Sequence, residues 1–230
     1  MRIWSWNIRK TVDAWSVIAK DSSVDAVLLQ EAIAPPTDAR LKVAPPVGEP
    51  WVTTGTGNYR TAIAWRGDRI TATERPLISI GDDSPNSLCV SRRGTLSAID
   101  VRLDDGVLTL VSAYAVWERP CSKERPIYAD ASAHRLISDI SGIVTSRDGH
   151  RLIVAGDFNI LHGHGEHGSE YWRERYASVF SRFDALGLKF IGPQFSSGGR
   201  QANPWPAELP RDSKNVPTFH SSKQSPSTAT

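Results

Sequence analysis

The strongest constraint on the fold is a pair of apolar stretches, GTLSAIDVRL and VLTLVSAYAV, separated by Asp104-Asp105-Gly106. Apolar and polar residues alternate along both stretches, as they do in strands with one buried face. An Asp-Gly step between two such runs predicts an antiparallel hairpin. This part of the chain is therefore expected to lie in a β-sheet.

Other segments predict further strands and three helices. Strands are expected over the following ranges: Arg2–Asn7, Val24–Glu31, Tyr59–Arg66, Ile70–Ile80 and the stretch RLIVAGD that starts at Arg151. Helices are expected at TVDAWSVIAK, where Val12, Trp15, Ile18 and Ala19 have helical spacing, at YADASAHRLISDISGIV, and at SEYWRERYASVFSRFDALGL before Gly187. The proline-rich residues 35–50 predict an irregular loop. Strands mixed with helices around a central hairpin indicate an α+β layered domain.

Composition narrows the class of protein. The 230 residues are 40% hydrophobic and 23% charged, which suits one large globular domain. A net charge of +2 is far from that of a protein that coats nucleic acid, but it allows an anionic substrate at one local patch. The two cysteines, Cys89 and Cys121, form no C-x-x-C motif, which favours reduced thiols and a cytoplasmic location. The sequence begins without the apolar region of a signal peptide, and no segment is long enough for a membrane span, so no membrane partner is expected.

Several polar residues stand where an apolar strand ends. They are Asn7, Glu31, Tyr114, Asp157 and Asn159. Buried strands carry few polar groups because an unpaired one is costly, whereas a polar side chain at a strand exit can line a pocket. If these strands are neighbours, the set suits a hard divalent cation such as Mg²⁺, which takes oxygen ligands and can polarise a phosphoryl group.

Each of these residues also has a purely structural interpretation. Glu31 could cap the next segment or pair with an arginine, and Asn7 could be an ordinary turn residue. Tyr114 could be an edge-strand aromatic residue, and the Gly156–Asn159 stretch could be a simple turn. The functional interpretation depends on the combination and its order along the chain.

That ordered set resembles the endonuclease/exonuclease/phosphatase superfamily, metal-dependent phosphodiesterases that include abasic-site endonucleases, DNase I-like nucleases, deadenylases and sphingomyelinases. The matching stretches are IWSWNI, DAVLLQE, VSAYAV and IVAGDFN. The resemblance covers about residues 1 to 188. It implies a DNase I-like α/β fold, a four-layer sandwich of two mixed sheets packed face to face and flanked by helices. It also implies Mg²⁺-dependent phosphodiester hydrolysis, with DNA or RNA as the expected substrate.

The resemblance assigns roles to the strand-end residues. Glu31 is implied as the principal Mg²⁺ ligand, with Asn7 beside it holding metal or phosphate, and Mn²⁺ is an expected substitute. Asp157 is implied to orient the nucleophilic water or to protonate the leaving oxygen. Asn159 and Tyr114 are implied to hydrogen-bond the phosphate as charge builds on its oxygens.

Basic residues near these positions are candidates for substrate binding. Arg9 and Lys10 closely follow Asn7, and we expect them to contact phosphate. The two arginines of the SRRG stretch, residues 91–94, could also touch phosphate, but an exposed pair before a strand is the commoner case. Two rival functions remain open: hydrolysis of a small-molecule or lipid phosphoester, and a catalytically incomplete binding member of the same fold.

The last part of the chain departs from the family pattern. After Gly192 the sequence is rich in Pro, Ser, Gly and Asn, so we divide the domain into residues 1–192 and a loop-rich segment, 193–230, in which we expect no strand beyond VPTF. Family members normally continue to an Arg-Ile-Asp-Tyr type strand and a final Ser-Asp-His, and neither motif is present. His220 lies upstream of the first missing motif and is not assigned its role. We therefore expect an exposed sheet edge, little activity in this chain alone, and completion by a longer chain or by a second chain.

Three histidines follow the Asp157 turn in a glycine-rich stretch, His162, His164 and His167. Imidazole suits Zn²⁺ or Ni²⁺, but flexible glycines do not preorganise a metal site. We expect these histidines to form a loop at the mouth of the active site that touches substrate.

Overall fold

The computed structural model describes residues 1–37, 40–55, 57–82, 87–119, 129–144, 151–163 and 169–190, and the backbone of residues 227–229. The chain divides into two compact units. The first comprises Met1–Tyr114, Asp139–Gly156 and Pro226–Thr230, and the second comprises Ala115–Ser138 and Asp157–Ser225. None of the described helices is long and apolar enough to cross a membrane.

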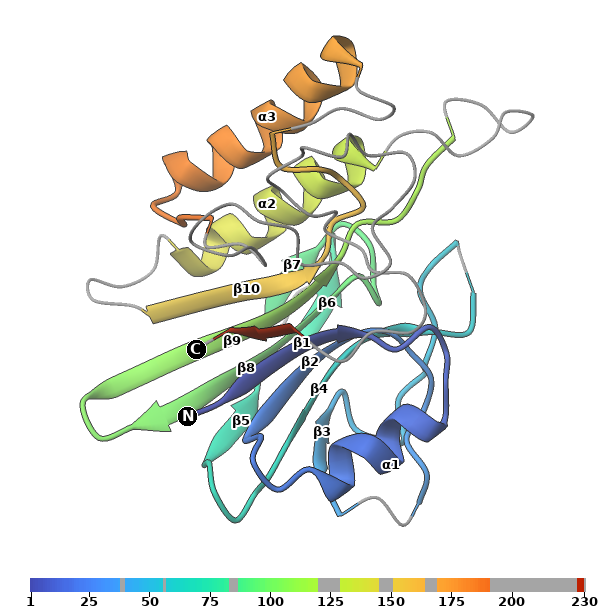
Figure 1. Cartoon of the computed structure of the whole chain (residues 1–230), viewed down its shortest axis with the longest axis vertical. Coiled ribbons are helices and arrows are strands. Elements are labelled where there is room, and N and C mark those ends of the chain that lie inside the picture. The colour runs from blue at the N-terminus through green and yellow to red at the C-terminus, as the bar shows by residue number, and fades with distance from the viewer. Residues whose placement is uncertain are drawn as a thin grey trace. The chain divides into compact units, whose positions relative to one another are not determined.

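A five-stranded mixed sheet forms one half of the first unit, with strand order β11-β1-β2-β4-β3. Its strands are β1 (Ile3–Asn7), β2 (Ala26–Ala32), β3 (Lys42–Ala44), β4 (Arg60–Trp65) and β11 (Ser227–Ala229). β1 and β2 run parallel, whereas β4 is antiparallel to both β2 and β3. The carboxyl ends of β1 and β2 therefore reach the same edge of the sheet (Figure 1).

A second sheet has the order β10-β9-β8-β5. Its strands are β5 (Ala72–Glu74), β8 (Leu96–Leu103), β9 (Gly106–Tyr114) and β10 (Arg151–Asp157). The register of β8 and β9, from Leu96 opposite Ala113 to Leu103 opposite Gly106, confirms the hairpin predicted from Asp104-Asp105-Gly106. Two short parallel strands, β6 (Leu77–Ser79) and β7 (Leu88–Val90), form a small separate sheet.

Strand alternation builds two apolar cores in the first unit. One face of β2 carries Ala26 and Leu28, which are buried in a cluster with residues of both large sheets. The other face carries Val27 and Leu29, which pack against the helix α1 (Asp13–Lys20). The two sheets thus pack face to face, with a helix outside the first sheet, and the predicted α+β class with mixed sheets flanked by helices is confirmed.

The second unit is built around helices. α2 (Asp130–Val144) begins there, and α3 (Glu170–Ala185) buries Tyr176 and Val179 as predicted. Asp130 at the start of α2 accepts a hydrogen bond of 2.7 Å from Arg175 of α3, which ties the two helices together. α3 ends just before Gly187, whose φ of +77° is the left-handed conformation that stops a helix.

Three local predictions need correction. The proline-rich residues 35–50 contain strand β3, because pairing with β4 overrides the local composition. Val12 precedes α1 and is 54% exposed, since only Ala14, Trp15 and Ile18 reach the core. The predicted strand Ile70–Ile80 is broken into β5 and β6, which belong to different sheets.

The end of the chain also differs from expectation. No strand was predicted there, yet β11 runs antiparallel to β1, with Ala229 opposite Ile3 and Ser227 opposite Ser5. This edge of β1 is therefore paired over these residues, and the two ends of the chain lie side by side (Figure 1). Unpaired N–H and C=O groups of an edge strand accept an extended segment whatever its side chains, which is why composition did not predict this pairing.

Candidate active site

The layer between the two sheets changes from apolar to polar toward one end. Gln30 of β2 donates a hydrogen bond of 3.0 Å to the hydroxyl of Ser112 on β9, and that hydroxyl donates to the carbonyl of Leu29. The hydroxyls of Thr61 on β4 and Ser97 on β8 lie 3.0 Å apart. These buried pairs join the two sheets and form a polar floor beneath the strand ends.

Glu31 stands above this floor because β2 is irregular at this point. Leu29 pairs with Ala62 and Ala32 pairs with Arg60, so Gln30 and Glu31 together lie opposite a single residue of β4. Glu31 has a φ of +47°. Such a bulge redirects the side chain away from the strict alternation of a strand. The Glu31 carboxylate consequently meets residues at the ends of two other strands.

Three predicted residues converge here. Oε1 of Glu31 accepts a hydrogen bond of 3.1 Å from the hydroxyl of Tyr114 at the end of β9. The same oxygen accepts one of 3.3 Å from Nδ2 of Asn7 at the end of β1. Asn7, Glu31 and Tyr114 thus form one hydrogen-bonded group, drawn from both sheets of the first unit.

Basic and aromatic side chains extend this group. The backbone N–H of Arg9 donates to Oδ1 of Asn7 at 3.0 Å, and that of Lys10 donates to the carbonyl of Glu31 at 2.9 Å. Nζ of Lys10 lies 4.4 Å from the ring centroid of Tyr59, whose ring meets Tyr114 edge-on at 5.9 Å. The sequence interpretation missed Tyr59, although it lies two residues before Thr61 and so follows the alternation of β4.

Backbone strain is concentrated at the predicted site residues. Within the described chain, the non-glycine residues with positive φ are Arg9, Lys10, Glu31 and Asn159. Each belongs to the predicted set, and a left-handed conformation of this kind costs about 1 kcal/mol or more. Such strain persists only where the surrounding structure imposes it, and it gathers at functional sites.

In the second unit, Asp157 and Asn159 form a preorganised turn. Oδ1 of Asp157 accepts a hydrogen bond of 3.0 Å from the N–H of Asn159, and Nδ2 of Asn159 donates to the carbonyl of Ala115 at 2.9 Å. The two side chains are nearly buried, with Asp157 3% and Asn159 5% exposed. In the first unit, Gly156 passes so close to Ala113 that an added Cβ would lie 1.8 Å from its carbonyl oxygen, so only glycine fits before Asp157.

Comparison with known proteins identifies the family. A family model described as the Endonuclease/Exonuclease/phosphatase family matches residues 4–210. The chain belongs to this family. Its members are metal-dependent phosphodiesterases and nucleases. None of the curated proteins compared matches the chain by sequence.

Solved structures of the same fold resemble the chain at low sequence identity. The endonuclease domain of TRAS1, a telomere-specific non-LTR retrotransposon, is 17% identical with a TM-score of 0.53, and the match covers 81% of this chain and 70% of that one. The catalytic domain of Xenopus laevis APE2 is also 17% identical, with a TM-score of 0.52, and the match covers 80% of this chain and 67% of that one. These similarities support the fold expected for the family.

Members of the endonuclease/exonuclease/phosphatase family generally depend on a divalent metal, and the group around Glu31 fits one. Oε1 of Glu31 is held by two donors, and the side chain is only partly buried. Among the described residues, no three His, Cys, Asp or Glu side chains gather into a metal-binding cluster. This donor set suits a hydrated Mg²⁺ or Mn²⁺ held by one or two carboxylates, and not an ion enclosed by protein ligands alone.

The histidine-rich stretch is only partly described. The ring of His162 stacks on Phe190 at 4.3 Å and meets Phe180 edge-on at 4.7 Å. His162 therefore packs in an aromatic cluster, since ring stacking stabilises a partly buried imidazole, and its place on a substrate-facing rim stays a prediction. His164, His167 and His220 lie outside the described residues.

Proposed function

We propose that this protein hydrolyses phosphodiester bonds with Mg²⁺ and that its substrate is DNA or RNA. The observation that carries the proposal is the convergence of Asn7 and Tyr114 on one carboxylate oxygen of Glu31. An acid needed only for stability would gain little from a strained φ of +47° at a strand end. A strained acid with a partly exposed carboxylate is instead suited to bind a metal.

In this proposal Glu31 and Asn7 hold the metal, as the family resemblance implies. A divalent ion held there would supply Lewis-acid chemistry, which polarises a phosphoryl group and favours attack by water. The hydroxyl of Tyr114 donates its one proton to Oε1 of Glu31 in this structure, and it would turn from that oxygen to donate to a phosphate oxygen of the substrate. Such a donor stabilises the transition state more than the ground state, because negative charge on the phosphate oxygens increases there.

Asp157 and Asn159 are proposed to act on a substrate phosphate, as the family resemblance implies. The Asp157 carboxylate would orient the attacking water or protonate the leaving oxygen, and Nδ2 of Asn159 would be a fixed donor. Their support is the turn itself, in which the Asn159 N–H already holds Oδ1 of Asp157. A group that is held before substrate binds needs no reorganisation during the reaction.

The choice of nucleic acid is supported by the basic residues at the site. Arg9 and Lys10 closely follow Asn7, and the ammonium group of Lys10 is held over the ring of Tyr59. These cations are proposed to contact phosphates of the strand, which is the usual source of affinity for nucleic acid. A small-molecule or lipid phosphoester remains the alternative substrate.

An activity screen with a matched pair of variants tests the proposal. Single-stranded DNA, duplex DNA, RNA and bis(p-nitrophenyl) phosphate are each incubated with Mg²⁺, Mn²⁺ or EDTA. Both this chain and a C-terminally extended version are assayed, because we expect little activity from this chain alone. Glu31→Gln removes one charge at the site, and Glu174→Gln makes the same change at an exposed position of α3. Cleavage of a nucleic acid should need Mg²⁺ or Mn²⁺ and should be lost only in Glu31→Gln. Equal rates in the two variants, or cleavage that persists in EDTA, would contradict the proposal.

A further inference from the structure

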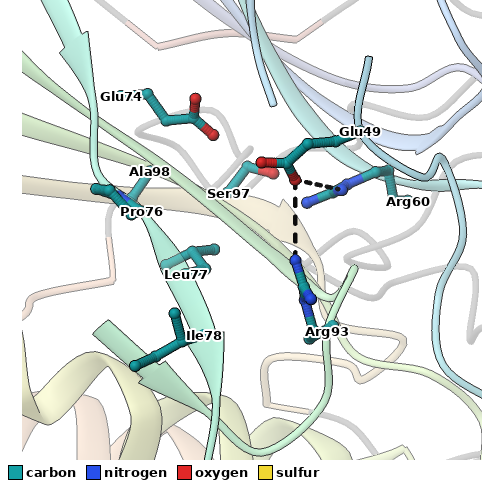
Figure 2. Close-up of a pocket in the computed structure, with 9 residues that line it drawn as sticks. All are labelled: Glu49, Arg60, Glu74, Pro76, Leu77, Ile78, Arg93, Ser97 and Ala98. Carbon is teal, nitrogen blue, oxygen red and sulfur yellow. Dashed lines mark ion pairs between the residues drawn. The ribbon is translucent and has the colours of Figure 1, made fainter. Parts of the chain in front are cut away.

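The first unit contains a pocket whose lining shares with the candidate active site only Ser97 of its polar floor. Its volume is about 270 Å³, and it lies between β4, β6 and the start of β8 (Figure 2). Leu77 and Ile78 of β6 form an apolar wall, and charged side chains face it. The pocket can therefore accept a small group that presents charge on one side.

Two guanidinium groups in this pocket share one carboxylate at long range. Nη1 of Arg60 lies 3.6 Å from Oε2 of Glu49, and Nη2 of Arg93 lies 3.9 Å from the same oxygen. Charge-assisted hydrogen bonds are normally about 2.7–2.9 Å long, so neither contact is a strong one. Figure 2 shows the two arginines directed at this carboxylate from different sides.

Arg60 is the buried member of the pair. Its side chain is only 7% exposed, and Nη1 donates to the carbonyl of Pro50 at 3.0 Å, which fixes the guanidinium. Its Nε is buried without a hydrogen-bond partner among the described residues. Burial lowers the pKa of Arg60, although the charge of Glu49 partly offsets this effect. An unsatisfied buried donor is costly, so a ligand with several acceptors would be favoured here.

Glu74 lies at the same pocket and does not supply the missing acceptor. In the part of the chain that the structure describes, its carboxylate makes no hydrogen bond or ion pair shorter than 4 Å. Burial and the neighbouring Glu49 raise the pKa of Glu74, so its ionised form is disfavoured. The shortest ion-pair distances of the two arginines are thus those of 3.6 and 3.9 Å to Glu49, which favours an anion that binds both guanidinium groups more closely.

We propose that this pocket binds a phosphate group, with Arg60 and Arg93 holding its oxygens in place of Glu49. Planar guanidinium groups match the geometry of phosphate oxygens, and one phosphate offers more acceptors than one carboxylate. Glu49 is 42% exposed and can turn outward to water when displaced. Arg93 belongs to the SRRG stretch, for which the sequence left phosphate contact open.

Two sources of the phosphate are distinguishable. One is a backbone phosphate of a nucleic acid, and this choice rests on the proposed function. The other is a free phosphorylated small molecule. The phosphate site is argued from the pocket alone and needs neither metal nor turnover. Phosphate binding measured without metal therefore tests this site separately from the proposed hydrolytic function.

Calorimetric titration with inorganic phosphate in EDTA tests the site. Arg93→Gln should weaken binding about tenfold by removing charge-assisted hydrogen bonds. Glu74→Gln should leave phosphate affinity equal or higher, because it removes a repulsive charge. Arg151→Gln, at an exposed ion pair with Asp105, is the control for overall charge and should bind like the unmodified protein. Thermal melts of Arg93→Gln should match those of the control.

Three outcomes would overturn the proposal: no saturable phosphate binding, equal affinities in Arg93→Gln and Arg151→Gln, or loss of binding in Lys10→Gln alone. The last result would move the phosphate to the candidate active site and leave the proposed function standing. Loss of binding in Arg93→Gln would support the pocket even if no cleavage were ever detected.

Titration with a twelve-residue single-stranded oligothymidylate at several salt concentrations identifies the source. If the pocket holds a backbone phosphate, Arg93→Gln should reduce the slope of log affinity against log salt by about one, and Arg151→Gln should not. If Arg93→Gln weakens inorganic phosphate but leaves the oligonucleotide slope unchanged, the phosphate site stands and the ligand is a free phosphorylated molecule.

Discussion

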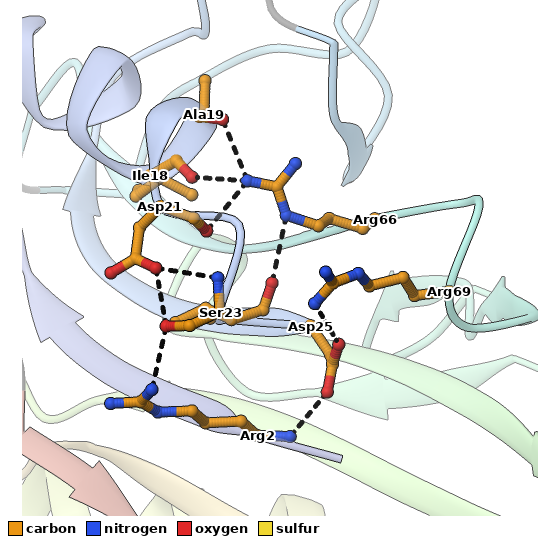
Figure 3. A network of polar contacts seen from close by, with 9 residues as sticks. Arg2, Ile18, Ala19, Asp21, Ser23, Asp25, Arg66 and Arg69 are labelled. Carbon is orange, nitrogen blue, oxygen red and sulfur yellow. Dashed lines mark hydrogen bonds and ion pairs between the residues drawn. The ribbon is translucent and has the colours of Figure 1, made fainter.

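The two ends of the five-stranded sheet use polar groups in opposite ways. At the end where β1 and β2 finish, Glu31 adopts a left-handed conformation and gathers Asn7 and Tyr114 around one oxygen. At the other end, where these strands begin, Arg66 donates four hydrogen bonds of 2.9–3.2 Å to backbone carbonyls (Figure 3). Three of those carbonyls belong to Ile18, Ala19 and Asp21, at the end of α1.

Arg66 satisfies carbonyls that the helix leaves without partners, and its positive charge complements the helix dipole. Asp25 beside it accepts hydrogen bonds from the N–H of Arg2 at 2.7 Å and from Arg69 at 3.2 Å. Within the described chain, no residue of this network has a positive φ. We therefore infer that one end of the sheet supplies stability and the other holds strain for function, and substitutions at the two ends should separate these properties.

The largest expected effect is on activity at the strained end. Glu31→Gln should lower the Mg²⁺-dependent cleavage rate by about a hundredfold to a thousandfold, similar to the loss of one preorganised electrostatic group. Its free energy of unfolding in urea should stay nearly constant, because glutamine retains the shape and can still accept from Tyr114. A large loss of stability with modest loss of rate would mean that Glu31 is structural.

The next effect is on stability at the opposite end. Arg66→Ala leaves several carbonyls without their donor and should lower the free energy of unfolding by about 2–3 kcal/mol. The cleavage rate of the folded fraction should not change. Arg69→Ala, which removes one partly exposed ion pair, is the matched control and should cost less than about 1 kcal/mol. Equal costs for the two variants would contradict the assigned role of Arg66.

Relief of strain should raise stability at the site. Arg9 has a φ of +50°, so Arg9→Gly should stabilise the protein by about 0.5–1 kcal/mol in urea denaturation while raising KM for an oligonucleotide. Arg102→Gly, in strand β8, is the matched control and should destabilise, because glycine there gains no conformational relief. A destabilised Arg9→Gly variant would show that the backbone at Arg9 is not strained.

The smallest effect is a pH dependence at the network end. Burial alone would raise the pKa of Asp25, but the hydrogen bonds from the Arg2 N–H and Arg69 outweigh it and hold that pKa below the ordinary 3.8. The stabilisation is therefore present above the unfolded pKa and is lost as pH falls through the folded pKa. Asp25→Asn should cost about 0.5 kcal/mol at pH 7, and the difference should shrink as the pH falls below 3.8. If Asp25→Asn still lowers the free energy of unfolding at low pH, the cost comes from the changed shape of the side chain and not from its charge.

Much of the site was predictable because strand alternation and strand ends are local properties. Asn7, Glu31 and Tyr114 were selected as polar residues at the exits of apolar strands, and the structure brings these three together. Tyr59 and Arg60 were missed because each gains its significance from distant residues. Tyr59 matters through Lys10 and Tyr114, and Arg60 through Glu49 and Arg93.

The sequence by itself determined the hairpin, the helical faces and the order of polar residues along the chain, because each depends on neighbours within a few positions. Only the tertiary structure decided the bulge at Glu31, the pairing of β3 and β11, and the packing of His162 among phenylalanines. Strand register and bulges arise from hydrogen bonds between segments far apart in sequence, which no local pattern encodes. The direction of the Glu31 carboxylate, on which the proposed metal site depends, is a product of that register.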